Sequence, residues 1–233
     1  DPQTQSALQS LFAAAHTDNN ALIKLTDAFV APLAFGTAGL RGALGAGPNR
    51  MNRVTVMQAA AGLAHYLIAN GFAEQPVVIG FDARYNSEVF AKDTAAVMAG
   101  AGLKPKLFSQ VVPTPVLAYS VRHQNVCAGV MVTASHNPPQ DNGYKVYLGD
   151  GRQIVSPVDE EIATLIKSVS DVRDINQGDT GNVVSDEVLN SYVSLSSQII
   201  TSGPTTEAQR KSVTSVYTAM HGVGWNTLKS VFR

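Results

Sequence analysis

Short apolar runs alternate with segments of helical period through the middle of this chain, and that alternation limits the possible fold more than any other feature. Residues 76–81 and 126–133 are apolar and rich in β-branched side chains, as expected of buried strands. The segments 87–101 and 115–123 have helical character, and 103–108 is a third expected strand. Strands that alternate with helices indicate an α/β fold. We therefore expect a three-layer α/β/α domain.

A short connection predicts that the sheet is mixed. The strand at 126–133 is followed by the loop 134–143 and then by an alternating strand at 144–148. A parallel pair would need a crossover of a dozen or more residues, so these two strands should be antiparallel. Within the loop, Asn142-Gly143 is expected to turn the chain back, so that Lys145 returns towards Ser135.

Further elements are expected on both sides of this core. Residues 4–30 have helical spacing, and Asn52 can cap a helix with an apolar stripe at 56, 57, 60, 63, 64, 67 and 68. Pro157 is placed to begin another helix. The glycine-dense stretch 35–47 is expected to be a loop or hairpin whose backbone approaches another group closely.

The C-terminal part is expected to open a second domain. The polar stretch 170–186 is interpreted as a connection, which divides the chain into domains 1–186 and 187–233. A helix near 187–200, a strand-like run at 213–218, a glycine-rich turn and a further helix would then begin a second, similar α/β domain. The division agrees with about 100–200 residues per domain.

Composition excludes several classes of protein. A net charge of −1 gives no overall attraction to nucleic acid or to an anionic membrane. Cys127 is the single cysteine, which rules out an intramolecular disulfide and a Cys-rich metal site, and its apolar neighbours predict a buried thiol. No apolar run approaches about 18 residues, the length of a membrane span. The first residues do not resemble a signal peptide, so we expect a cytoplasmic location.

The segment 133–145, T-A-S-H-N-P-P-Q-D-N-G-Y-K, holds most of the reactive chemistry. It leaves the end of a buried strand, and ligands of open α/β sheets bind beyond the carboxyl ends of the strands. It brings together a hydroxyl, an imidazole, two asparagine amides and an ammonium. From these residues alone, a polar turn and a reactive site both fit. The adjacency of Ser135 and His136 is weak support for a nucleophilic pair, because neighbouring side chains on an extended segment point apart.

Three motifs in the same order resemble those of the α-D-phosphohexomutase family. Ser135 to Lys145 is similar to the family's phosphoserine loop, in which T-x-S-H-N-P precedes N-G and a lysine. Residues 35–42, F-G-T-A-G-L-R-G, resemble its F-G-T-x-G-x-R-G segment, and residues 80–87 resemble G-x-D-x-R-x-x-S. Residues 217–224 are similar to Y-T-x-x-H-G-x-G of the phosphoglucomutase and phosphopentomutase branch, although Ala219-Met220 stand where Pro-Leu is expected.

The resemblance implies a mutase that moves a phosphoryl group between the 1- and 6-hydroxyls of a hexose phosphate, with glucose preferred over mannose. The reaction would pass through a phosphoserine enzyme and a bisphosphorylated sugar. Ser135 would carry the phosphoryl group, and Lys145 is the leading general acid/base, since a lysine near other cations can have a lowered pKa. His136 is the second candidate for that role, or a residue that orients the phosphate.

The same resemblance implies the remaining parts of the site. Arg41, Thr37 and Asn142 are expected to bind phosphate. Asp82 and Arg84 are expected to be structural, not because of the resemblance but because an aspartate and an arginine after a strand can fix a loop. One Mg²⁺ is expected on the phosphate of Ser135, with hexose 1,6-bisphosphate as activator and a sugar phosphate as the partner. The family's D-G-D-x-D-R metal loop is absent from these 233 residues. We therefore expect the N-terminal part of a longer enzyme, with little mutase activity of its own.

Two alternatives stay open. A Ser-dependent sugar phosphatase would use Ser135 and His136 as a nucleophilic pair and would transfer phosphate to water rather than to a sugar. A non-catalytic fragment would only bind a sugar phosphate. The sequence leaves the oligomeric state open.

Overall fold

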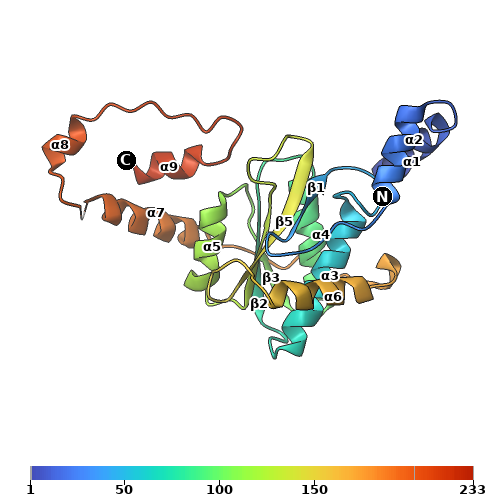
Figure 1. The fold of residues 1–233 in the computed structure, drawn as a ribbon. Coiled ribbons are helices and arrows are strands. Elements are labelled where there is room, and N and C mark those ends of the chain that lie inside the picture. Colours follow the sequence, from blue (N-terminus) through green and yellow to red (C-terminus); the bar gives the residue numbers. More distant parts are fainter. Residues whose placement is uncertain (1, 202, 233) are drawn as a thin grey trace.

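The computed structural model describes residues 2–201 and 203–232. Within them, a six-stranded sheet with the order β1-β5-β4-β2-β3-β6 lies between two layers of helices (Figure 1). The strands are β1 (Leu40–Ala43), β2 (Pro76–Phe81), β3 (Lys104–Leu107), β4 (Ala128–Val132), β5 (Asp141–Leu148) and β6 (Asn182–Val183). The helices are α1 (Pro2–Ala14), α2 (Asn19–Phe29), α3 (Arg53–Ala69), α4 (Ser87–Gly100), α5 (Thr114–His123), α6 (Val158–Ser168), α7 (Asp186–Thr201), α8 (Glu207–Lys211) and α9 (Trp225–Val231), with a 3-10 turn at Val172–Asp174. The expected three-layer α/β/α domain is confirmed.

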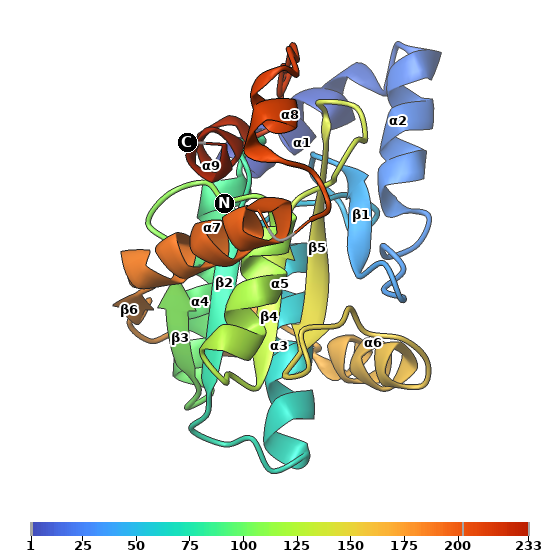
Figure 2. The same cartoon turned by 90° about the vertical axis from the view of Figure 1, so that its left-hand side faces the viewer.

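Each face of the sheet has its own apolar core, because successive strand residues point to opposite faces. On β2, Val77 and Ile79 pack towards α3, α4 and α6, whereas Val78 packs towards α5 and α7. Figure 2 shows α5 and α7 in front of the sheet. The strands in the middle of the sheet are buried on both sides, which explains their continuous apolar runs.

The sheet is mixed, as the short connection predicted. Strand β2 is parallel to β3 and β4, while β5 runs antiparallel to β4, with Val130 opposite Val146. On its other side β5 pairs antiparallel with β1, and Arg41 lies opposite Gly143. The carboxyl end of β4 therefore opens into the loop that carries Ser135, next to the β1–β5 edge.

The expected turn at Asn142-Gly143 is wrong. Both residues lie inside β5, where Asn142 pairs with Gly42 of β1, and the chain reverses before residue 141 instead. The reason is that the glycine-dense stretch 35–47 supplies a strand that keeps this part of β5 extended. The prediction that residues 35–47 form a loop or hairpin is therefore incomplete, because this stretch contains β1.

Other local expectations are confirmed or corrected. The Asn52 side chain caps α3 by accepting a hydrogen bond from the Thr55 amide at 3.0 Å. The predicted apolar stripe of α3 is buried except for Ile68, which lies near the helix end and is 36% exposed. The Cys127 thiol is buried, as expected, and burial raises its pKa to about 11.

The C-terminal part differs most from expectation. Residues 213–218 form no strand: Val216 is 99% exposed, and among residues 2–201 and 203–232 no strand lies beside this run to pair with it. The connection at 170–186 contains β6, which pairs with β3, and the polar stretch 201–212 contains α8. The division into domains 1–186 and 187–233 stays a prediction.

Among the helices that the structure describes, none is long and apolar enough to cross a membrane.

Candidate active site

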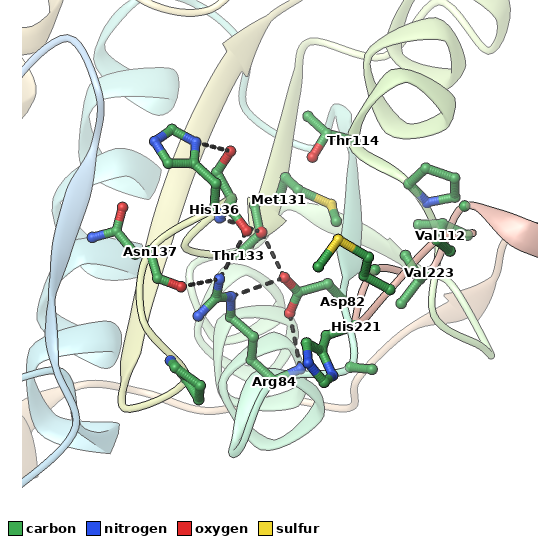
Figure 3. Close-up of a pocket in the computed structure, with 18 of the residues that line it drawn as sticks. Asp82, Arg84, Val112, Thr114, Met131, Thr133, His136, Asn137, His221 and Val223 are labelled. Carbon is green, nitrogen blue, oxygen red and sulfur yellow. Dashed lines mark hydrogen bonds and ion pairs between the residues drawn. The ribbon is translucent and has the colours of Figure 1, made fainter. Parts of the chain in front are cut away.

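Ser135 lies at the carboxyl end of β4, in a cavity of about 810 Å³. Three loops of the α/β domain line it: the segment after β2, the approach to α5 and the Ser135 loop itself. A fourth wall comes from residues 219–224, which lead into α9. Figure 3 shows His136, Thr133, Asp82, His221 and Val223 among the side chains that line this cavity. The position agrees with the rule that open α/β sheets bind ligands beyond the strand ends.

The backbone of Ser135 has a left-handed conformation, with φ 59°. Residues with a Cβ seldom adopt it, and it marks a site where the surroundings hold the chain in place. In this conformation the side chains of Ser135 and His136 do not point apart as they would on an extended segment. Ser135 Oγ and His136 Nδ1 lie 3.4 Å apart, at the long limit of a hydrogen bond.

A partly buried hydrogen-bond network holds the amide side of Ser135. Its N–H donates to Thr133 Oγ1 at 2.9 Å, and Thr133 Oγ1 lies 2.6 Å from Asp82 Oδ2. Asp82 Oδ1 also accepts from the Ser87 hydroxyl at 2.8 Å and from the Arg84 amide at 3.1 Å. The N-terminal end of α4 and the end of β4 are thereby tied to one carboxylate.

Arg84 holds the rest of the loop. Its guanidinium donates to four backbone carbonyls at 2.8–3.1 Å, those of Ser135, Asn137, Pro138 and Asp141. The planar fork of arginine suits such an arrangement, because its N–H groups point in fixed directions. The expectation that Asp82 and Arg84 fix a loop is confirmed.

Two cations meet at the β1–β5 edge beside the loop. Arg41 Nη1 donates to Asn137 Oδ1 at 3.0 Å, while its buried Nε has no hydrogen-bond partner among the described residues. Burial lowers the pKa of the partly buried Lys145, and the positive charge of Arg41 lowers it further. The negative charge of Asp82 acts in the opposite direction. This edge therefore offers an unsatisfied donor and a lysine that releases its proton more readily than usual.

Thr37 lies on a tight turn against the same edge. The turn closes through Gly36 and Gly39, and Gly39 has φ 74°. A Cβ at Gly39 would lie 1.8 Å from the carbonyl oxygen of Tyr144, so this position requires glycine. Thr37 is exposed, and its carbonyl accepts from Gln153 Nε2 at 2.6 Å. Neither Thr37, Arg41 nor Lys145 lines the cavity that holds Ser135 and His136.

The Asn142 side chain is buried in the structure and does not face the cavity. Its amide donates to the Tyr85 carbonyl at 2.8 Å and to Ser87 Oγ at 3.0 Å. Its Oδ1 accepts from the Gly143 amide at 2.7 Å. The side chain is thus committed to tying β5 to the start of α4, and both of its amide hydrogens are engaged there instead of being free for a phosphate.

Sequence reasoning gave no role to Thr133 and Asn137, which the structure places at the centre of these contacts. A signal was present for Thr133, since a threonine hydroxyl often bonds the amide two residues further on. For Asn137 no local signal existed, because its partner Arg41 is 96 positions away.

The described residues contain no group of three or more His, Cys, Asp or Glu side chains that could hold a metal ion. The Asp82 carboxylate already accepts from Thr133, Ser87 and Arg84. What this part of the chain can offer to Mg²⁺ is an oxygen on Ser135, which by itself does not make a site.

Comparison with known proteins agrees with this geometry. Residues 32–173 match the family model for phosphoglucomutase/phosphomannomutase, alpha/beta/alpha domain I. A probable phosphomannomutase of Haemophilus influenzae is 50% identical over 184 residues, covering 76% of this chain and 36% of the relative. The phosphopentomutase of Mus musculus is 41% identical over 175 residues, covering 72% and 27%.

A solved structure shows the same fold. It is a Thermus thermophilus protein described as a phosphomannomutase, with a TM-score of 0.63 and 29% identity, and the match covers 73% of this chain and 36% of that one. The fold and the serine loop define an α/β/α domain of phosphosugar-mutase type. The chain belongs to the phosphoglucomutase/phosphomannomutase family, and it spans about a third of the length of the curated relatives it matches.

Proposed function

We propose that the protein containing this chain is a phosphosugar mutase that moves a phosphoryl group between the 1- and 6-hydroxyls of a hexose phosphate. The observation that carries the proposal is the presentation of Ser135 in a cavity at the end of β4, on a left-handed backbone held from both sides. A residue held in this way at a strand end is typical of a reacting group. Membership of the family supports the same assignment.

In the proposed reaction, phosphorylated Ser135 donates its phosphoryl group to the free hydroxyl of the sugar phosphate. The bond between Ser135 Oγ and phosphorus breaks and a bond between the sugar oxygen and phosphorus forms. Lys145 takes the proton of the sugar hydroxyl, and the proton is passed on to the leaving Ser135 oxygen, which becomes a hydroxyl again. The bisphosphorylated sugar then reorients in the site, so that its other phosphoryl group faces Ser135 and is returned to it. The lowered pKa of Lys145 supports its role as base, because a neutral amine is then more populated near neutral pH.

The other residues would stabilise charge. Arg41 has an unsatisfied Nε next to the loop, which suits it to a phosphate oxygen. Thr37 is proposed to assist at the same edge, and His136 to orient the phosphate on Ser135. Mg²⁺ bound through that phosphate would neutralise charge on the transferred group, with its other ligands supplied from outside this chain.

The sugar is a narrower proposal. We favour glucose over mannose, with hexose 1,6-bisphosphate as the activator that first phosphorylates Ser135. The two relatives reported above are a probable phosphomannomutase and a phosphopentomutase, so mannose and pentose phosphates are the competing substrates. A cytoplasmic location is proposed with it, in keeping with a lone, reduced cysteine.

A product assay on the full-length protein tests the proposal. Glucose 1-phosphate, mannose 1-phosphate and ribose 1-phosphate are each supplied with Mg²⁺ and a trace of the matching bisphosphate. A mutase gives the isomeric sugar phosphate without free phosphate, whereas a phosphatase releases inorganic phosphate. Ser135→Ala should abolish the isomerisation, and Ser168→Ala, which removes an exposed hydroxyl on α6, should not. Release of inorganic phosphate, or binding without turnover, would overturn the proposal.

A further inference from the structure

We propose that Asp82, Thr133 and Arg84 act together as positioning residues for Ser135. They hold the peptide groups on both sides of Ser135 and so keep its backbone in the left-handed conformation that presents the hydroxyl to the cavity. The inference rests on the proposed role of Ser135 as phosphoryl carrier, and it assigns to these residues an effect on the rate and not only on stability.

The direction of each hydrogen bond on the amide side can be assigned. The Ser135 N–H can only donate, so Thr133 Oγ1 accepts from it at 2.9 Å. A threonine hydroxyl has one proton, which must therefore point elsewhere. The carboxylate of Asp82 lies 2.6 Å away and can only accept. Asp82 thus fixes the rotation of the Thr133 hydroxyl, and the hydroxyl fixes the Ser135 amide.

This arrangement requires a carboxylate at position 82. Asp82 receives donors at both oxygens: the Thr133 hydroxyl at Oδ2, and the Ser87 hydroxyl and the Arg84 amide at Oδ1. The Arg84 guanidinium lies 3.4 Å from Oδ2 as well. An asparagine has the same shape but would turn an NH₂ group towards donors on one of these sides. Asp82→Asn therefore tests the chemistry with little change in volume.

The carbonyl side of Ser135 is held by the same ion pair. Arg84 Nη2 donates to the Ser135 carbonyl at 2.8 Å, while Arg84 Nε faces Asp82. Both side chains are largely buried, with exposed fractions of 14% and 15%, so water competes weakly for these bonds. Figure 3 shows Asp82 between Thr133 and Arg84. One ion pair thus holds both neighbouring peptide groups of a residue at φ 59°.

The consequence for catalysis follows from the conformation. Without the Thr133 contact, the Ser135 amide is free to turn, and the backbone can relax to a common extended or helical region. The hydroxyl would then leave its place in the cavity while the sheet beneath it stays folded. A displacement of about 1 Å in a reacting group can cost on the order of 100-fold in rate.

The test uses the full-length protein with Thr133→Val, which keeps the shape of the side chain and removes the hydroxyl. Thr133→Ser restores the hydroxyl, and Thr94→Val is the matched control. Thr94 is also fully buried and its hydroxyl bonds the Phe90 carbonyl at 2.8 Å, within α4. Two quantities are measured: hydrogen exchange at the Ser135 amide, and kcat and KM for sugar phosphate isomerisation.

We expect Thr133→Val to speed exchange at Ser135 at least about 10-fold and to lower kcat by about 10- to 100-fold with little change in KM. Thr133→Ser should have an exchange rate and a kcat near those of the wild type. Asp82→Asn should have values near those of Thr133→Val. Equal exchange and equal kcat in Thr133→Val and Thr94→Val would overturn the inference. If Thr133→Val fails to fold, Asp82→Asn compared with Thr94→Val decides by the same criteria. A wild-type protein without mutase activity would refute the proposed function. The exchange data would still test whether the Thr133 hydroxyl holds the Ser135 amide.

Discussion

Arg84 and Ser135 are 51 positions apart in the chain, yet the Arg84 guanidinium donates a 2.8 Å hydrogen bond to the Ser135 carbonyl. The contact is possible because β2 and β4 are parallel neighbours in the sheet, so that the loops after them leave at the same edge. Arg84 makes similar bonds to three other carbonyls of the Ser135 loop. The shape of this loop is therefore set by a residue outside it.

Replacing Arg84 with lysine should destabilise the chain although the charge is kept. A lysine ammonium is compact and cannot reach four carbonyls at once. We expect a loss of at least about 2 kcal/mol in the free energy of unfolding, measured by urea denaturation. Arg152→Lys is the control, because its side chain is 87% exposed, and it should change stability by less than about 0.5 kcal/mol. Equal effects of the two substitutions would contradict the role of Arg84.

The sequence predicted the central sheet well because its signals are local. Continuous apolar runs marked β2 and β4, and the short connection after β4 required an antiparallel neighbour. The strands β1 and β6 were missed for a physical reason. Leu40–Ala43 lies among glycines and is extended because β5 lies beside it, and Asn182–Val183 is two residues long and pairs only with β3.

The reactive side chains of the candidate site could be predicted from the sequence, but the hydrogen bonds that hold them in place could not. Ser135, His136 and Lys145 could be chosen from side-chain chemistry and motif resemblance. The contact of Arg41 with Asn137 and the commitment of Asn142 to buried hydrogen bonds depend on strand pairing across long separations. No pattern within a short window of sequence reports such pairs.

Gly39→Ala should cost far more than an ordinary glycine substitution. The new Cβ would lie 1.8 Å from the Tyr144 carbonyl oxygen, at a residue with φ 74°. Gly71→Ala is a matched control, since Gly71 has φ 85° but nothing within 4 Å of its Cβ position. In the control, the free energy of unfolding should fall by about 1 kcal/mol from backbone strain alone. Gly39→Ala should lose at least about 2 kcal/mol more in thermal or urea unfolding, and similar losses in both variants would contradict the close approach.

Arg41→Gln should raise the pKa of Lys145. The positive charge of Arg41 disfavours the Lys145 ammonium, so its removal lets the amine keep its proton to higher pH. Burial is the larger cause of the lowered pKa, so the pKa should stay below 10.5 in the variant. An NMR titration of the Lys145 side chain measures the change, with Lys24→Gln on α2 as the control. A pKa that falls or stays constant in Arg41→Gln would show that the two cations do not interact.

The lowered pKa of Lys145 also predicts how stability changes with pH. In the folded state the ammonium loses its proton at lower pH than in the unfolded chain, so the unfolded state binds more protons between the two pKa values. The unfavourable contribution of the buried charge is complete below the folded-state pKa, and it is relieved as pH rises towards 10.5. Lys145→Met should remove this contribution and flatten the dependence in urea unfolding across that window.

Lys145→Ala and His136→Ala should separate the two candidates for proton transfer. In the full-length enzyme, Lys145→Ala should lower kcat by about 10²–10⁴-fold, the usual range for a positioned acid/base. Ser135 should still accept a phosphoryl group from the bisphosphate in that variant. His136→Ala should lose less, because we assign it to orienting the phosphate. If His136→Ala abolishes turnover and Lys145→Ala keeps more than about a tenth of it, the two roles are reversed.

The central claim is that Ser135 carries the phosphoryl group, and one measurement tests it most directly. The full-length protein is incubated with glucose 1,6-bisphosphate and Mg²⁺, digested, and the phosphorylated position is identified by peptide mass spectrometry. We predict one phosphate, located on Ser135; when the bisphosphate is radiolabelled, excess unlabelled glucose 1-phosphate should carry the label from Ser135 into sugar phosphate while Ser135 stays phosphorylated. Phosphate found only on other residues, or a Ser135→Ala variant that keeps full mutase activity, would contradict the account.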